Sequence, residues 1–297
     1  MKNTTTIDPN SISTAALHQI LLTAVAPRPI ALASTIDKNG NINLSPFSFF
    51  NVFSANPPIL IFSPARRGRD NTTKHTYENV KEVNETVINI VNYAMVEQMS
   101  LTSTEYDKGV NEFAKAGFTP IPSEKIKPPR VAEAPISFEC VVDNIIELGT
   151  KGGAGNLIIS RVVTIHIKDE YKGVNGKLDT KKLDLVARMG ANWYTRANEN
   201  ALFEIPKPTL TKGIGVDKLP LHVINSEILS GNDLGRLGNI AQKPNAISIN
   251  KWKSEKKIQS ILKILDSKIK HKKIHLIAKK QLKNNNLEEA LSILFCV

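Results

Sequence analysis

The chain has little cysteine and no long apolar run. Only two of its 297 residues are cysteine, Cys140 and Cys296, which allows neither a disulfide framework nor a thiolate metal site. The apolar stretches stay far below the roughly 18 residues that a membrane-spanning helix needs. The N-terminal stretch also has no cationic segment leading into an apolar one. We therefore expect a cytoplasmic globular protein with two structural thiols and no membrane partner.

The positive charge of the chain is concentrated near its C-terminus. The formal net charge is +11, and residues 206–297 hold 17 Lys and Arg against 7 Asp and Glu. Residues 1–205 are therefore nearly neutral. A basic patch confined to one end says little about what the larger part of the chain binds.

The first two thirds of the chain predict many strands and few helices. The expected strands cover residues 29–36, 42–53, 59–62, 86–93, 136–148 and 156–167. The turn chemistry of Asp37 to Gly40 predicts that the first two form a hairpin. Because helices do not regularly separate the strands, a small barrel is favoured over a doubly wound parallel sheet.

Helices are expected at a few places around these strands. Ser13 is a predicted N-cap for a helix reaching about Val25, and helical spacing also marks residues 73–83 and 95–105. The proline-rich stretch 120–135 is expected to be irregular.

A second domain is expected after the prolines at 206 and 208. We place the boundary between a domain at 1–205 and a basic, partly helical extension at 206–297. The spacing of Ile258, Ile261, Leu262, Leu265 and Ile269 predicts the apolar face of one helix. Asn286 with Glu289 predicts a capping box for the last helix.

The stretch from Pro27 to Pro58 is the most specific part of the sequence, reading PRPIALASTIDKNGNINLSPFSFFNVFSANPP. Together with Lys127 to Val131, Glu139-Cys140 and Arg188 to Tyr194, it resembles the flavin reductase-like family of FMN-binding split barrels. The resemblance covers roughly residues 15–205. It implies a mainly β fold, a split β-barrel with peripheral helices, to which this chain adds a C-terminal helical appendix similar to the extension of some bacterial members.

The resemblance also implies where FMN would bind. Ser34 and Thr35 would donate to the phosphate or ribityl chain, and Ser48, Phe49 and Asn51 would meet the isoalloxazine ring. Such a site needs hydroxyls, cations, amides and apolar groups close together, and this block supplies them. The alternative is that the hydroxyls are ordinary strand residues and that Asn51 only forms a turn.

A second phosphate element of the family is a Lys-Asp-Thr that opens a helix, where N–H groups attract an anion. Here the sequence is Lys74-His75-Thr76, so Lys74 and Thr76 carry over and His75 departs from the pattern. The alternative for Lys74 is a solvated residue at a helix start. Arg66, Arg67 and Arg69 are either loop charges or further phosphate contacts.

The implied activity is transfer of a hydride from NADH or NADPH to bound FMN, with electrons passing to a flavin, oxygen or another acceptor. A catalytic triad is not expected, because the flavin carries the chemistry. The family is typically homodimeric, and a free flavin or an oxygenase is a further partner. Many members carry Gly-Asp-His where this chain has Gly155-Asn156-Leu157, which leaves a non-catalytic FMN-binding electron carrier as the alternative.

The basic extension offers a third hypothesis. Residues 251–283 hold 12 Lys and Arg against 2 Asp and Glu, with Trp252 as the one aromatic residue. Nucleic-acid binding is disfavoured because stacking residues are scarce, and a solvated helix surface is favoured over a module for nucleic acid or another anionic surface. His271 and His275 lack a third ligand, and His166 fits a core or surface histidine, so no metal site is expected.

Overall fold

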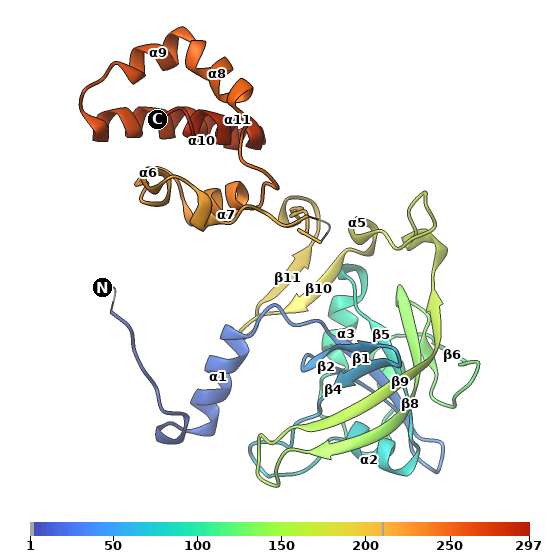
Figure 1. Cartoon of the computed structure of the whole chain (residues 1–297). Coiled ribbons are helices and arrows are strands. Elements are labelled where there is room, and N and C mark those ends of the chain that lie inside the picture. Colours follow the sequence, from blue (N-terminus) through green and yellow to red (C-terminus); the bar gives the residue numbers. More distant parts are fainter. Residues whose placement is uncertain (1–2, 210) are drawn as a thin grey trace. The chain divides into compact units, whose positions relative to one another are not determined.

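The computed structural model describes residues 3–209 and 211–297, which form two compact units. The first unit ends at Phe203 and the second begins at Glu204, whereas the prolines led us to expect a boundary between 205 and 206. Each unit has a hydrophobic core of its own. The two units are therefore described separately (Figure 1).

The first unit is built on a seven-stranded sheet in which all neighbours are antiparallel. Its order is β2-β1-β5-β8-β9-β4-β3. The strands are β1 (Ala31–Ile36), β2 (Ile42–Phe47), β3 (Phe50–Ala55), β4 (Pro58–Phe62), β5 (Glu85–Ile90), β8 (Ile136–Glu147) and β9 (Asn156–Ile167). The predicted hairpin is confirmed, since β1 pairs with β2 around the Asp37–Gly40 turn. The strand expected over 42–53 is interrupted at Ser48 and Phe49.

The sheet curls into a split barrel because its two edges are consecutive in the chain. Only Ser48 and Phe49 link β2 at one edge to β3 at the other. Three Cα–Cα steps reach at most about 11 Å, so the edges must lie close together. No ladder joins β2 to β3 among the described residues, and the barrel stays open along this seam. The expected fold class is confirmed.

Short helices cover the strands. Helix α2 (His75–Glu82) lies on β1 and β2, while α3 (Val96–Leu101) and α4 (Glu112–Ala116) lie over β2. Met95, Met99 and Phe113 from this region pack on Leu32 and Leu44. The other face of β1 belongs to a second cluster, in which Ala33 packs near Phe62. The proline-rich stretch is irregular except for two-residue strands, β6 (Pro120–Ile121) and β7 (Arg130–Val131).

Helix α1 (Thr14–Ala24) begins as predicted, with the Ser13 hydroxyl accepting a hydrogen bond from the Ala16 N–H. None of its side chains is buried in the chain. After it, Arg28 joins three segments: its guanidinium donates to the carbonyls of Leu22 and Val25, to the Met189 carbonyl and, at 3.4 Å, to the Ser48 hydroxyl. Arg28 thus fixes the end of α1 and the barrel seam to the hairpin that follows.

That hairpin, β10 (Leu185–Arg188) with β11 (Tyr194–Ala197), comes after α5 (Thr180–Leu183) and ends the first unit. Its tip lies close to α1, because a Cβ on Gly190 would come within 2.5 Å of the Thr23 hydroxyl. The glycine therefore allows the hairpin to reach the helix.

The second unit consists of helices around one apolar core. They are α6 (Leu221–Ile224), α7 (Gly231–Gly238), α8 (Ala246–Ser254), α9 (Lys256–Leu262), α10 (Ser267–Lys283) and α11 (Leu287–Leu294). The core includes Leu237, Ile274, Ala278 and Leu294. Among the described residues, every helix is too short or too polar to cross a bilayer.

Two sequence predictions fail in this unit. The expected single helix over 258–269 is divided into α9 and α10, because the Asp266 carboxylate accepts the Ile269 N–H and starts a new helix. Leu265 is consequently exposed in the connection, not buried. The capping box at Asn286 is also absent, since the Asn286 amide donates instead to Gln281.

Candidate flavin site

Ser34 and Thr35 lie in the middle of β1, with both side chains completely buried. Successive residues of a strand point to opposite faces, so their hydroxyls face different sides of the sheet. The Thr35 hydroxyl accepts a hydrogen bond from the Asn79 amide of α2 at 3.2 Å. The Ser34 hydroxyl has no hydrogen-bond partner among the described residues. The structure therefore does not bring these two hydroxyls to one surface.

The link between β2 and β3 is more accessible. Ser48 accepts the hydrogen bond from Arg28, and the Phe49 ring is 38% exposed and meets His18 of α1 edge-on, with ring centroids 6.3 Å apart. Asn51 is exposed on β3, with its side-chain oxygen accepting the Val52 N–H. These three residues line the seam of the barrel, where an aromatic ring can lie against an apolar edge and backbone groups.

Lys74 and Thr76 lie where α2 begins. Lys74 is the N-cap residue, and no side chain among the described residues caps the first N–H groups of the helix. The Thr76 hydroxyl is buried and accepts a hydrogen bond from the Asn43 amide of β2 at 2.9 Å. A small cavity of about 20 Å³ lies beside this helix start, lined by Asn43, Ser45, Arg67, Lys74, Glu105 and Glu112 among others.

Three cations pair with one carboxylate, that of Glu105, which lines this cavity with Arg67 and Lys74. Oε1 of Glu105 lies 3.0 Å from Nε of Arg67 and 3.2 Å from Nζ of Lys74, and Oε2 pairs with Arg69. Hydrogen bonds from Arg67 and then Lys74 lower the pKa of Glu105 to about 2. We call Arg67, Arg69 and Lys74 the cation cluster. Positive charge at the N-terminus of a helix is the arrangement that proteins use to bind anions, so the cation cluster is a candidate anion site.

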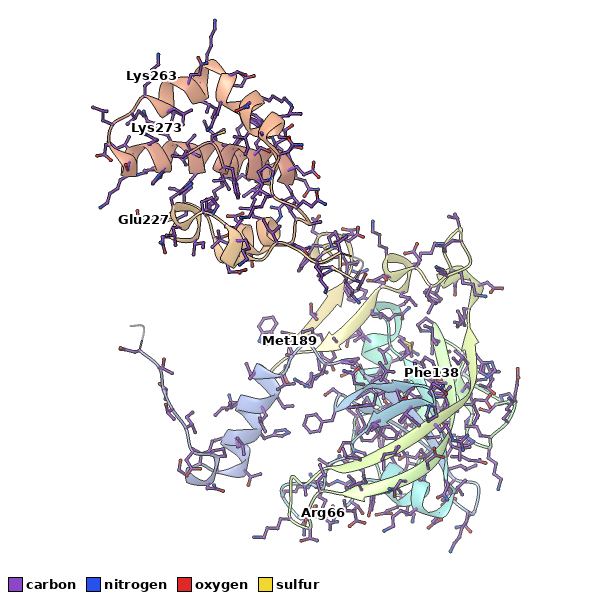
Figure 2. The ribbon with its side chains drawn as sticks, viewed as in Figure 1. Arg66, Phe138, Met189, Glu227, Lys263 and Lys273 are labelled. Atoms are coloured by element: carbon purple, nitrogen blue, oxygen red, sulfur yellow. The ribbon has the colours of Figure 1, made fainter. Side chains whose placement is uncertain are left out.

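The loop before α2 holds the cation cluster in place. Arg67 also donates to the Thr72 hydroxyl at 3.0 Å and to the Thr73 carbonyl. Gly152 allows its own loop to pack closely on the Arg67 loop, because a Cβ at position 152 would lie 2.9 Å from the Arg67 carbonyl oxygen. Arg66, labelled in Figure 2, instead bonds Asn71 of its own loop. Of the three arginines considered from the sequence, only Arg67 and Arg69 join the cluster.

Two acidic residues of this region were not anticipated from the sequence. Glu105 ends the stretch after α3, and nothing in its local pattern indicates that it pairs with cations some 30 residues earlier. Glu112 is buried, and its Oε2 accepts the Leu44 N–H at 2.9 Å. Burial raises the pKa of Glu112. Its place in the first turn of α4, after the N-cap Asn111, was the only available signal.

The stretch Gly155-Asn156-Leu157 has a structural role. The buried Asn156 amide donates to the Pro64 carbonyl at 2.9 Å, and a Cβ on Gly155 would lie 2.7 Å from the Ser63 hydroxyl. His166, on the same strand, bonds the buried Glu139 carboxylate at 2.7 Å. Glu139 in turn accepts the N–H groups of Glu124 and Lys125. His166 is thus part of a network that ties the proline-rich stretch to the barrel.

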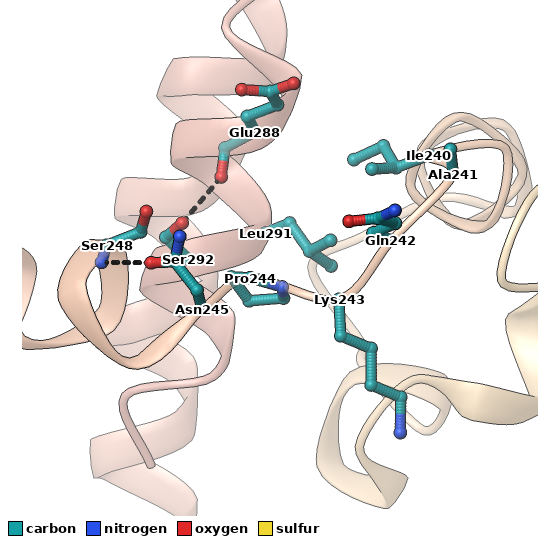
Figure 3. A pocket seen from close by; sticks show the side chains of 10 residues that line it. All are labelled: Ile240, Ala241, Gln242, Lys243, Pro244, Asn245, Ser248, Glu288, Leu291 and Ser292. Carbon is teal, nitrogen blue, oxygen red and sulfur yellow. Dashed lines mark hydrogen bonds between the residues drawn. The ribbon is translucent and has the colours of Figure 1, made fainter.

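The second unit has a larger cavity, in which the described lining residues include a single cation. It measures about 290 Å³ and lies between the loop at 240–245 and α11 (Figure 3). Its polar groups bond one another: the Ser292 hydroxyl donates to the Glu288 carbonyl, and the Asn245 side chain accepts the Ser248 N–H. Among the described residues that line it, Lys243 is the one cation. The cation cluster of the first unit is therefore the better candidate for a phosphate.

The first unit is similar to known proteins along most of its length. The family model described as flavin reductase like domain matches residues 24–181. The uncharacterized protein BH2278 of Halalkalibacterium halodurans is 36% identical over 208 residues, which cover 69% of this chain and 98% of that protein. An Aquifex aeolicus protein is 38% identical over 181 residues, covering 61% and 90% of the two chains.

The fold is similar to a solved structure as well. Nitrilotriacetate monooxygenase component B from Bacillus cereus superposes with a TM-score of 0.64 at 30% identity, covering 69% of this chain and all of that one. Since the family match ends at residue 181 and the second unit begins at Glu204, the family gives no account of the second unit.

Proposed function

Since the chain belongs to the family of flavin reductase-like domains, we propose that its first unit holds FMN as a flavin-dependent oxidoreductase that takes a hydride from NADH or NADPH. When bound, FMN supplies the hydride acceptor and passes electrons to a flavin, to oxygen or to another acceptor. The chain itself has to hold the phosphate, present the ring and exclude water.

The observation that carries this proposal is the cation cluster at the start of α2. A dianionic phosphate needs cations and N–H donors, and Arg67, Arg69 and Lys74 supply positive charge beside an uncapped helix N-terminus. The Glu105 carboxylate already pairs with all three cations. An anion of higher charge is suited to the same place, so these residues fit the phosphate of FMN.

The ring of FMN would lie at the barrel seam. Phe49 offers a partly exposed apolar edge, and Ser48 and Asn51 offer polar atoms on either side of it. In this proposal the hydrogen bond between Thr76 and Asn43 holds the start of α2, where the phosphate binds, against β2. Ser34 and Thr35 would support β1 from opposite sides of the sheet, because both side chains are buried.

A second copy of the chain is the proposed partner. Apolar side chains are exposed on α1, a helix with no buried residue, and on β3, an edge strand. They are Ile20 and Leu21 of α1, its C-cap Val25, and Val52 and Phe53 of β3. Exposed apolar side chains grouped in this way often mark a protein–protein contact. A homodimer through this face would cover the ring at the seam. Sedimentation equilibrium tests it: the chain should be a dimer, and Phe53→Asp should give monomers.

An oxygenase or a free flavin is the proposed electron acceptor. The similar Bacillus cereus protein is named as component B of a monooxygenase, which supports a function in which reduced flavin is supplied to a separate protein. The proposal predicts NAD(P)H oxidation that is faster when free flavin is added to the holoprotein.

One observation favours the electron carrier as a second candidate. Where many family members have Gly-Asp-His, this chain has Gly155-Asn156-Leu157, and Asn156 is committed to the Pro64 carbonyl. Mixing the FMN-loaded protein with NADH and with NADPH under anaerobic conditions distinguishes the two functions. An oxidoreductase loses its absorbance at about 450 nm, whereas a carrier stays yellow with both nucleotides.

A further inference from the structure

The exposed side chains of α10 in the second unit are lysines, two large apolar residues and one serine. Ile269 is 48% exposed and Leu276 is 51% exposed, while Ile274, Ala278 and Leu282 of the same helix are buried in the core. The exposed cations of this helix are Lys268, Lys272, Lys273, Lys280 and Lys283. Leu265, just before the helix, is 97% exposed.

These side chains form an ordered pattern around the helix. Residues seven apart lie within about 20° of each other, so Ile269 and Leu276 form a line along its outer side. At about 100° per residue, Lys268, Lys272 and Lys283 lie on one side of this line, and Lys273 and Lys280 lie on the other. We call these seven residues, with Leu265, the α10 face. Lys273 is labelled in Figure 2.

The charge of the α10 face is not neutralised within the described residues. None of its five lysines lies in an ion pair there, whereas Lys251 pairs with Glu289 and Lys279 pairs with Asp233 elsewhere in the unit. The nearest acid along the chain, Asp266, uses its carboxylate to cap α10. A surface with this much unpaired positive charge attracts an anionic partner.

The apolar line decides which anionic partner fits. Nucleic-acid phosphates would meet Ile269 and Leu276 at the centre of the face, where these side chains gain nothing from them. Trp252, the one aromatic residue of this basic region, donates its indole N–H to Glu289, and the region has no arginine. Stacking and bidentate readout are therefore missing. An anionic bilayer offers negative headgroups over an apolar layer, and lysine stems reach past such residues to the headgroups.

We propose that the α10 face binds an anionic lipid surface, with Leu265, Ile269 and Leu276 entering the headgroup region and the five lysines contacting the headgroups. This attachment is peripheral. It is independent of flavin binding. It differs from the expectation of no membrane partner, which rested on the absence of a membrane-spanning run. The sequence pattern had also put Leu265 and Ile269 on the apolar face of one helix. Their exposure is visible only in the structure.

The test uses the full-length protein and sedimentation with vesicles of phosphatidylcholine, alone or mixed with phosphatidylglycerol. We expect binding to the mixed vesicles only, weakening as salt is added. Lys272→Gln/Lys273→Gln/Lys280→Gln should weaken it by more than about tenfold. A matched control, Lys207→Gln/Lys212→Gln/Lys243→Gln, removes the same charge from exposed positions of the same unit outside the face and should change binding far less.

A second variant separates apolar insertion from charge. Ile269→Ser/Leu276→Ser keeps every lysine and should weaken vesicle binding by about fivefold or more. Circular dichroism of each variant checks that the helices persist. Failure to bind mixed vesicles, equal loss in the control variant, or tighter binding of duplex DNA through the same three lysines would each overturn the proposal. Flavin content should be the same in all these variants.

Discussion

Nζ of Lys74, the N-cap of α2, lies 3.2 Å from Oε1 of Glu105, a residue 31 positions later in the chain. This pair, with Arg67 and Arg69 around the same carboxylate, marks the place where we expect the phosphate of FMN. The cations and the carboxylate should affect the affinity for FMN in opposite directions. Removing a cation should weaken flavin binding, and removing the carboxylate should strengthen it.

Lys74→Ala should raise the Kd for FMN because a charge-assisted contact to the phosphate is lost. A contact of this kind contributes about 1–3 kcal/mol, which corresponds to roughly a 5- to 150-fold change. Fluorescence titration of the apoprotein measures it. Lys81→Ala, at the other end of the same helix, is the matched control and should bind FMN as the unaltered protein does.

Glu105→Gln should lower the Kd for FMN, by up to about fivefold, since the phosphate no longer competes with a carboxylate for three cations. The gain should disappear with riboflavin, which has no phosphate. The same titration gives both numbers. Weaker FMN binding in Glu105→Gln would mean that the carboxylate organises the cluster and does not compete with the ligand.

Ser34→Ala separates two roles of a residue that the sequence assigned to FMN. Its hydroxyl is buried and finds no partner among the described residues, so removing it breaks no hydrogen bond there. We expect the free energy of unfolding of the apoprotein to be unchanged or slightly higher. A clear rise in the Kd for FMN would instead mean that Ser34 contacts the ligand.

Arg28→Lys should destabilise the first unit. The guanidinium serves the Leu22, Val25 and Met189 carbonyls at once, and a single ammonium cannot reproduce that geometry. These hydrogen bonds are partly buried, and leaving a carbonyl there without a donor costs up to about 1–3 kcal/mol. Thermal unfolding followed by circular dichroism should show a lower Tm. An unchanged Tm would mean that α1 and the β10–β11 hairpin are held by other contacts.

The second unit should lose stability in acid through His275. This ring is buried, with Nδ1 2.8 Å from the Ser226 hydroxyl and Nε2 3.0 Å from Nδ1 of His222. Ser226 also accepts the N–H groups of Ile228 and Leu229, so its proton goes to Nδ1 of a neutral His275. Burial, followed by the charges of His222 and His271, lowers the pKa of His275 to about 4.

The direction of the pH effect follows from that lowered pKa. Below pH 6.5 the unfolded chain binds a proton at His275 that the folded unit excludes, so stability is full above this pH and falls as the pH drops toward 4. The loss is about 3 kcal/mol at most. Urea unfolding of Trp193→Phe, in which Trp252 alone reports, measures it. His275→Gln should flatten the pH profile, and an equally steep profile in that variant would exclude His275 as the cause.

Much of the first unit could be predicted from the sequence because its signals are local. Alternating apolar residues gave the strands, Asp37 to Gly40 gave a turn, and Ser13 gave a helix cap that the structure confirms. The closure of the barrel depends on the two-residue link at Ser48 and Phe49, which a pattern read as one continuous strand could not reveal.

The site and the second unit were harder to predict from the sequence, because they depend on contacts between residues far apart in the chain. The pairing of Glu105 with Arg67 and Lys74 crosses more than 30 residues, and the hydrogen bond from Leu44 to Glu112 crosses 68. In the second unit, the Asp266 cap restarts the helix and turns Leu265 outward. The periodic pattern of apolar residues continues across Asp266, so the pattern alone does not reveal that a helix cap lies there.

The central claim is that the first unit binds FMN through its phosphate at the cation cluster. Titration of the full-length apoprotein with FMN, set beside the same titration with riboflavin, tests it most directly. We predict saturable binding at micromolar concentrations or below, an absorbance band at about 450 nm in the complex, and much weaker binding of riboflavin. A protein that stays colourless, or that binds both flavins equally, would contradict the claim.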